Sequence, residues 1–192
     1  MNEIVAKGFI MDEPQFSHEC HGKKFYQFTL QVFRESGTPD LIKCIISENY
    51  LPIIDFYVEV RGEVRTFNKD GKLLIFVYVH NLYETDGGEL NQVNIEGFIC
   101  KKPIYRTTPL GREIAETIIA VNNSFGRSSY IPCIFWGYNA RKVARIGVGK
   151  RISVNGRLQS RDYLKTLDDG TKETRRTYEL SVGKYEELEN ES

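Results

Sequence analysis

The chain has 192 residues, which is long for one domain and sufficient for two of about 90–100 residues. Residues 1–90 carry a net charge of −5 (9 basic against 14 acidic residues), and residues 91–192 carry +5 (17 against 12). Only the second half therefore has the charge of a polyanion-binding surface. No apolar run reaches about 18 residues and no charged-then-apolar leader starts the chain, which argues against a membrane or secreted protein and for a cytoplasmic one.

An internal repeat organises the chain. Residues 2–14 (NEIVAKGFIMDEP) align with residues 91–103 (NQVNIEGFICKKP) at an offset of 89. Later pairs keep this offset: Gly22 with Gly111, Val32 with Val121, and Cys44 with Cys133. Gly62 and Gly156 then pair at an offset of 94, so the second copy is about five residues longer before that point. The sequence thus predicts two units of one fold.

In the first copy, alternating apolar residues and turn signals predict five strands, at residues 4–11, 25–33, 41–47, 58–67 and 73–83. Residues 17–24 are expected to form a turn. Pro52 interrupts residues 48–56, so any helix there should be brief. Asp70-Gly71 is a strong turn signal, which predicts that the last two strands form a hairpin.

The second copy repeats this order. Its strands are expected at residues 93–101, 114–122, 130–137, 151–163 and 175–185, with a helix near residues 139–146 and a turn at 168–170. Five strands with a short helix between the third and fourth is the order of an OB barrel. We therefore predict an all-β chain of two tandem five-stranded OB-fold barrels, each with a short helix between strands 3 and 4.

The boundaries follow from the repeat. We expect a first repeat at residues 1–84, a linker at 85–90, a second repeat at 91–186 and a short acidic tail at 187–192. The linker contains Asp86-Gly87-Gly88, which is typical of a flexible junction, and few contacts are expected to cross it.

Several blocks of the second repeat resemble the bacterial single-stranded DNA-binding protein family. They are NQVNIEGFICKKP at 91–103, IIAVN at 118–122, YIPCIFWG at 130–137, and GRLQSR at 156–161 followed by Tyr163. The resemblance extends over residues 91–185. It implies a non-enzymatic OB-fold protein that binds single-stranded DNA without sequence preference in replication, repair or recombination. The family assembles four OB domains, so two per chain would imply a homodimer.

Aromatic residues are the candidates for stacking on bases, since a ring binds any base with little sequence preference. The resemblance places the family's stacking positions at Phe125, Tyr130, Trp136 and Tyr163. Along residues 130–136 the side chains alternate, with Ile131, Cys133 and Phe135 on one face and Tyr130, Ile134 and Trp136 on the other. The pattern leaves open which face is exposed, and so whether these aromatics bind a ligand or fill the core.

Long cationic side chains in the second repeat are the candidates for phosphate contacts. They are Lys101, Lys102, Arg106, Arg112, Arg127, Arg157, Arg161 and Arg176. The alternative for each is an ordinary solvated surface residue. Their concentration in one repeat favours binding.

The first repeat departs from this pattern, with Ser47 at the position of Trp136 and a negative net charge. Phe33 and Phe67 remain candidates for stacking there, but we expect this barrel to bind weakly or to serve in packing and assembly.

The acidic end of the chain lacks the apolar tip by which the family recruits replication and repair proteins, so recruitment by that route is not expected. His18-Glu19-Cys20-His21 offers three metal ligands without an evident fourth, and no metal, cofactor or catalytic group is expected.

Three other functions stay open at this point. A primosome-type replication accessory would act chiefly through protein contacts, which the acidic first repeat favours. An RNA-binding OB protein would use the same surface on another nucleic acid. An OB-fold nuclease would need a metal-binding carboxylate cluster beside the groove.

Overall fold

The computed structural model describes residues 1–123 and 126–189. In the first repeat five strands close into a barrel in the order β1 (Asn2–Ile10), β3 (Lys23–Phe33), β4 (Pro39–Ser47), β6 (Lys72–Glu84) and β5 (Tyr57–Lys69), with β5 returning to β1. All of these pairs are antiparallel except β4 with β6. This is the strand order and pairing of an OB barrel.

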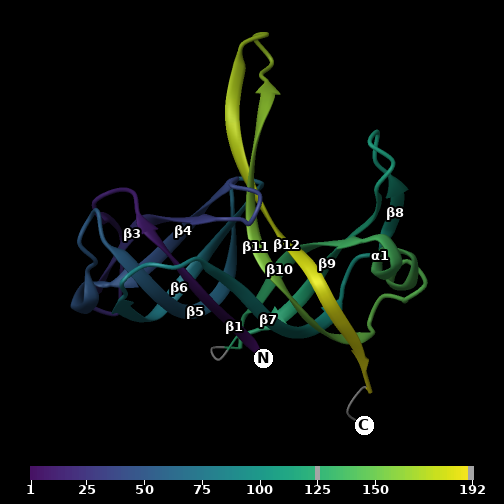
Figure 1. The fold of residues 1–192 in the computed structure, drawn as a ribbon, viewed down its shortest axis with the longest axis horizontal. Helices are drawn as coiled ribbons and strands as arrows, with labels where there is room; N and C mark the ends of the chain where they lie inside the picture. Colours follow the sequence, from purple (N-terminus) through teal and green to yellow (C-terminus); the bar gives the residue numbers. More distant parts are fainter. Residues whose placement is uncertain (124–125, 190–192) are drawn as a thin grey trace.

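The second repeat has the same topology (Figure 1). Its barrel runs through β7 (Leu90–Ile99), β9 (Glu113–Asn122), β10 (Ser128–Trp136), β12 (Lys172–Leu188) and β11 (Arg151–Thr166), which returns to β7. Here too the single parallel pair is that of the third and fifth barrel strands, β10 with β12. The prediction of two tandem OB barrels is confirmed.

Each barrel carries an additional edge strand that the sequence did not indicate. β2 (Gln15–Cys20) pairs with β3, and β8 (Ile104–Thr107) pairs with β9. The expected turn at residues 17–24 is therefore too long: residues 17–20 belong to β2, residues 23–24 belong to β3, and the turn is confined to His21-Gly22, where both residues have positive φ. Nearly every residue of β2 and β8 is exposed, so neither strand shows the apolar alternation that predicts a strand.

The helical segments differ between the repeats. The second has α1 (Gly137–Val143), two residues earlier than expected, and the first has only a single 3₁₀ turn at Glu48–Tyr50. Pro52 lies two residues after that turn, and its ring is incompatible with a helix that continues through it. None of the described helices is long and apolar enough to cross a bilayer.

The two barrels share one continuous sheet instead of touching lightly at the junction. β6 ends at Glu84 and β7 begins at Leu90, yet β1 and β7 pair antiparallel from Asn2↔Ile95 to Lys7↔Leu90. This pairing joins all twelve strands, with β1 and β7 in the middle of the molecule (Figure 1). The expectation of few contacts across the junction is therefore wrong, because the first strand of each repeat exposes an edge that the other can pair with.

The repeated glycines mark where each barrel closes. A Cβ at Gly97 would lie against the Ala120 carbonyl of β9 and 2.8 Å from Ile119 Cγ2, and a Cβ at its counterpart Gly8 would meet the β3 backbone in the same way. Glycine is thus required because two strand backbones approach closely there.

We expect Gly97→Ala to lower the free energy of unfolding by about 1–3 kcal/mol, because the added methyl group must push β7 and β9 apart. Gly183→Ala is the control: its Cβ would have only Asn155 O within 4 Å, at 3.8 Å. Urea unfolding followed by circular dichroism measures both, and the control should change by less than about 0.5 kcal/mol. Equal losses in the two variants would contradict the close-approach explanation.

Candidate functional site

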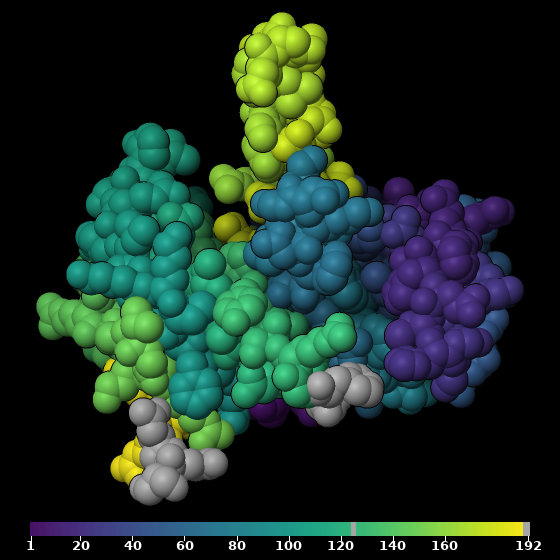
Figure 2. Space-filling view, turned by 180° about the vertical axis from the view of Figure 1, so that it is seen from behind, coloured from purple at the N-terminus to yellow at the C-terminus, as the bar shows by residue number. Residues whose placement is uncertain are grey.

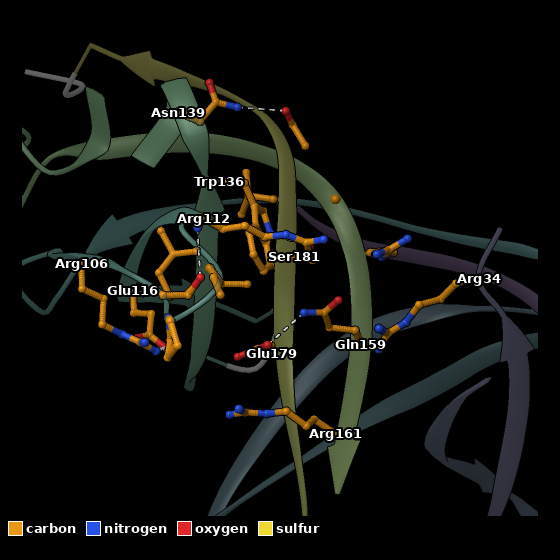
Figure 3. A pocket seen from close by; sticks show the side chains of 18 residues that line it. Arg34, Arg106, Arg112, Glu116, Trp136, Asn139, Gln159, Arg161, Glu179 and Ser181 are labelled. Atoms are coloured by element: carbon orange, nitrogen blue, oxygen red, sulfur yellow. Dashed lines mark hydrogen bonds and ion pairs between the residues drawn. The ribbon is translucent and has the colours of Figure 1, made fainter. Parts of the chain in front are cut away.

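A hollow of about 960 Å³ lies on the outer face of β10 and β12 in the second repeat. We call it the main hollow. Its floor includes Ile134, Trp136 and Ser181, and its two walls are the β8–β9 turn at residues 108–112 and the stretch of β11 at residues 156–161. Figure 2 shows the hollowed face between residues 100–120 and the projecting β11–β12 hairpin, and Figure 3 shows the side chains that point into it.

Trp136 takes its place from the alternation of β10. Ile131, Cys133 and Phe135 are buried in the barrel core, so Trp136 is on the opposite, outward face. Its ring is half-buried, and its Nε1–H donates a hydrogen bond to Ser181 Oγ at 3.0 Å (Figure 3). An aromatic ring is thus held at a defined orientation while part of its surface stays open to the hollow.

Four of the predicted cations line the main hollow: Arg106, Arg112, Arg157 and Arg161. Arg106 makes a bidentate ion pair with Glu116, at 2.9 and 3.2 Å, which raises the pKa of the guanidinium. The other three are exposed and have no carboxylate partner in the described part of the chain. They leave positive charge available to a ligand.

Two carboxylates also face the main hollow, Glu116 and Glu179, and the latter accepts a hydrogen bond from Gln159 Nε2 at 2.9 Å. With Arg34, the hollow has five arginines against these two acidic groups. The arrangement suits a ligand that carries several negative charges and flat rings.

The remaining predicted residues lie elsewhere. Tyr130 is 50% exposed beside the first repeat, where its N–H donates to Thr66 Oγ1 at 2.8 Å. Tyr163 is 43% exposed on the projecting β11–β12 hairpin (Figure 1). Phe125 lies outside the described residues. The other cations are exposed but do not line the main hollow: Lys101, Lys102, Arg127, and Arg176, which is ion-paired to Asp162 at 2.7 Å.

Arg34 was not predicted, because it belongs to the acidic first repeat and carries no local sign of binding. It reaches the main hollow from the turn between β3 and β4 (Figure 3). Only the packing of one repeat on the other brings it there.

The corresponding face of the first repeat is occupied by its own side chains. His18 stacks on Phe25 with ring centres 4.9 Å apart, and the Arg65 guanidinium lies 3.7 Å from the centre of the Tyr78 ring. These rings already have partners within the protein. Phe33 and Phe67 are 39% and 56% exposed, and Phe67 follows Arg65 by two residues on β5. No group of three or more His, Cys, Asp or Glu residues in the described ranges is placed to hold a metal ion.

Comparison with known proteins identifies relatives of the second repeat. The profile of the single-strand binding protein family matches residues 90–188. Single-stranded DNA-binding protein 1 of Staphylococcus aureus (strain COL) is 37% identical over 81 residues, which are 38% of this chain and 48% of the relative. Single-stranded DNA-binding protein A of Bacillus subtilis (strain 168) is also 37% identical over 81 residues, 38% of this chain and 47% of the relative. The chain spans about half the length of these curated relatives.

A solved structure matches the chain over its full length. The wild-type single-stranded DNA binding protein from Thermus aquaticus covers 100% of this chain and 95% of its own, with a TM-score of 0.79 and 21% sequence identity. At that identity the likeness concerns the fold, and it supports the tandem arrangement of two OB barrels.

The free arginines should make the main hollow the strongest anion-binding surface of the molecule. We expect Arg157→Ala to elute from a heparin column at lower salt than the unmodified protein, because an unpaired charge in the hollow is lost. Lys184→Ala is the control, since Lys184 is exposed on β12 but does not line the hollow. An equal decrease for both variants would mean that retention depends on net charge alone.

Proposed function

We propose, from the premise that this chain belongs to the single-strand binding protein family, that it binds single-stranded DNA without marked sequence preference through the main hollow. The family's members are binding proteins and not enzymes. The observation that carries the proposal is the half-buried Trp136 among three exposed arginines, Arg112, Arg157 and Arg161, none of which has a carboxylate partner in residues 1–123 and 126–189. Rings beside cations provide stacking and phosphate neutralisation together.

The mechanism follows from these two kinds of contact. A base that stacks on an exposed ring gains about 1–3 kcal/mol, nearly independent of its identity. Trp136 offers this surface in the main hollow, with Tyr130 and Tyr163 as further stacking positions outside it, and the resemblance adds Phe125, which is outside the described residues. The arginines of the hollow bind phosphates, with Lys101, Lys102, Arg127 and Arg176 as outlying contacts. The protein would thereby keep a strand unpaired and protected during replication, repair or recombination, in the cytoplasm and on the nucleoid.

In this proposal the second repeat is the main binding unit. The first repeat has a net charge of −5, Ser47 at the position of Trp136, and rings that already contact one another, since Phe25 touches both His18 and Tyr78. It would serve chiefly in packing and assembly, with two chains forming a homodimer of four OB barrels.

One observation favours a second candidate, a primosome-type accessory that acts through protein contacts. The connector between β4 and β5 of the first repeat exposes four large apolar side chains: Tyr50, Leu51, Ile53 and Phe56. In the second repeat helix α1 occupies this place, with Arg141 and Lys142 in its last turn. Exposed apolar groups of this size are typical of a surface that contacts another protein.

Trp136 allows a direct test because it is the only tryptophan. We expect its fluorescence to be quenched by oligo-dT at low salt and to recover as salt is added, because stacking and counterion release both occur in the hollow. In an anisotropy assay with labelled oligo-dT, Trp136→Ala should weaken binding by about 1–3 kcal/mol.

Tyr138→Ala is the matched control, since Tyr138 is 65% exposed on α1 and does not line the main hollow. It should bind as the unmodified protein does. Binding without quenching would locate the DNA elsewhere, and no binding at all would favour the protein-contact candidate. A stronger response to oligo-U than to oligo-dT would identify an RNA-binding protein instead.

The proposed homodimer has a simple signature. We expect sedimentation equilibrium to give twice the 22.2 kDa mass of one chain. The mass should not change on addition of 0.5 M salt if apolar contacts hold the dimer, since salt of about that concentration weakens mainly exposed charge pairs. A monomer mass at micromolar concentration would contradict this assembly.

A further inference from the structure

A second hollow lies at the contact between the two repeats. We call it the seam hollow; its volume is about 350 Å³. One wall is the β3–β4 turn of the first repeat, with Arg34 and Thr38, and the other is the base of the β11–β12 hairpin, with Arg161 and Arg176. Arg34 and Arg161 also line the main hollow, so the two spaces adjoin at these side chains.

Arg34 is held rigidly at this boundary. Its Nε and Nη2 donate to the carboxylate of Asp40 at 3.0 and 2.6 Å, and Nη2 also donates to Ser160 O at 3.1 Å. Asp40 is only 1% exposed and accepts a further bond from Ser160 N–H at 2.8 Å. The hydrogen bonds to Asp40 raise the pKa of Arg34 despite its partial burial, so the guanidinium stays charged.

This network leaves part of the guanidinium unused. Arginine has five N–H donors, and the bonds to Asp40 and Ser160 use only those on Nε and Nη2. Nη1 makes no hydrogen bond within the described residues and is not among their buried polar atoms that lack a partner, so it is in contact with solvent. A planar donor group that is fixed before binding loses little entropy when it contacts a phosphate.

The opposite wall offers a second cation. Arg161 is exposed and has no carboxylate partner among the described residues, whereas Arg176 is engaged by Asp162 at 2.7 Å. Arg34 from one repeat and Arg161 from the other thus mark a continuous path from the main hollow to the β3–β4 turn.

We propose that single-stranded DNA bound in the main hollow continues across the seam hollow, where its phosphates contact Arg34 and Arg161. The acidic first repeat then takes part in binding through this one turn, and the site is composite. This inference rests on the proposed function of the main hollow.

Thr38 provides a test that leaves the Arg34–Asp40 network intact. Its side chain is exposed at the seam hollow and bonds only to Ser36 Oγ, among the described residues. Two lengths of oligo-dT separate the sites: one of about 8 nucleotides, within the range that one OB barrel covers, and one of about 35. Thr38→Glu and Thr38→Lys change the charge of the turn in opposite directions.

We expect Thr38→Glu to weaken binding of the long oligonucleotide about fivefold at low salt, as one unit charge about 4 Å from a phosphate would in water. Thr38→Lys should strengthen it and steepen the dependence of log K on log salt by about 0.7, the value for one added phosphate contact on a single strand. The short oligonucleotide should bind both variants as it binds the unmodified protein.

Gln15→Glu is the charge-matched control, because Gln15 is exposed on the edge strand β2, which ends the sheet on the first-repeat side. It should leave both lengths unaffected. If Thr38→Glu, Thr38→Lys and Gln15→Glu all bind the long oligonucleotide equally, no strand crosses the seam and the inference fails, while tight binding of the short one would still support the main hollow. If the short oligonucleotide does not bind the unmodified protein, the proposed function itself fails.

Discussion

The antiparallel pairing of β1 with β7 is the interaction on which the rest of this molecule depends. It joins the first strand of each repeat over six residue pairs and merges two barrels into one sheet. Each of these strands is also tied to its own barrel by an asparagine, since Asn2 bonds to both backbone groups of Val64 and Asn91 to both of Leu158. A backbone pairing of this kind holds the two repeats together and also fixes their relative placement, because the strand register determines which residues lie opposite each other.

That placement creates two equivalent contacts between the repeats, which have diverged in chemistry. In one, Thr66 N–H donates to Ser129 Oγ and Tyr130 N–H to Thr66 Oγ1. In the other, Ser160 N–H donates to Asp40 and Leu41 N–H to Ser160 Oγ. The second contact alone contains a buried carboxylate, and a buried charge needs a partner. Arg34 supplies it, and in doing so brings a cation of the acidic repeat to the edge of the main hollow.

The main hollow meets two requirements for base stacking that are difficult to satisfy together on a protein surface. A ring must be exposed to stack on a base, yet it must be held so that little entropy is lost on binding. Trp136 meets both through its hydrogen bond to Ser181 and its position on the outward face of β10. In the first repeat Ser47 replaces the tryptophan, His18 stacks on Phe25, and Phe25 packs against Tyr78, so side chains of the protein fill the corresponding face.

The sequence by itself determined the repeat, the order of the barrel strands, the basic second half and the two faces of residues 130–136, because these are local patterns of spacing, alternation and charge. It also predicted four of the arginines that line the main hollow. Only the tertiary structure decided that the Trp136 face is outward, that Tyr130 lies beside Thr66 and not in the hollow, and that Arg34 reaches it. The pairing of β1 with β7 is likewise visible only in the tertiary structure. The reason is physical: alternation defines two faces but not which one the barrel encloses, and a bond from Arg34 to Ser160 joins residues 126 apart in the chain, whose meeting depends on the whole fold.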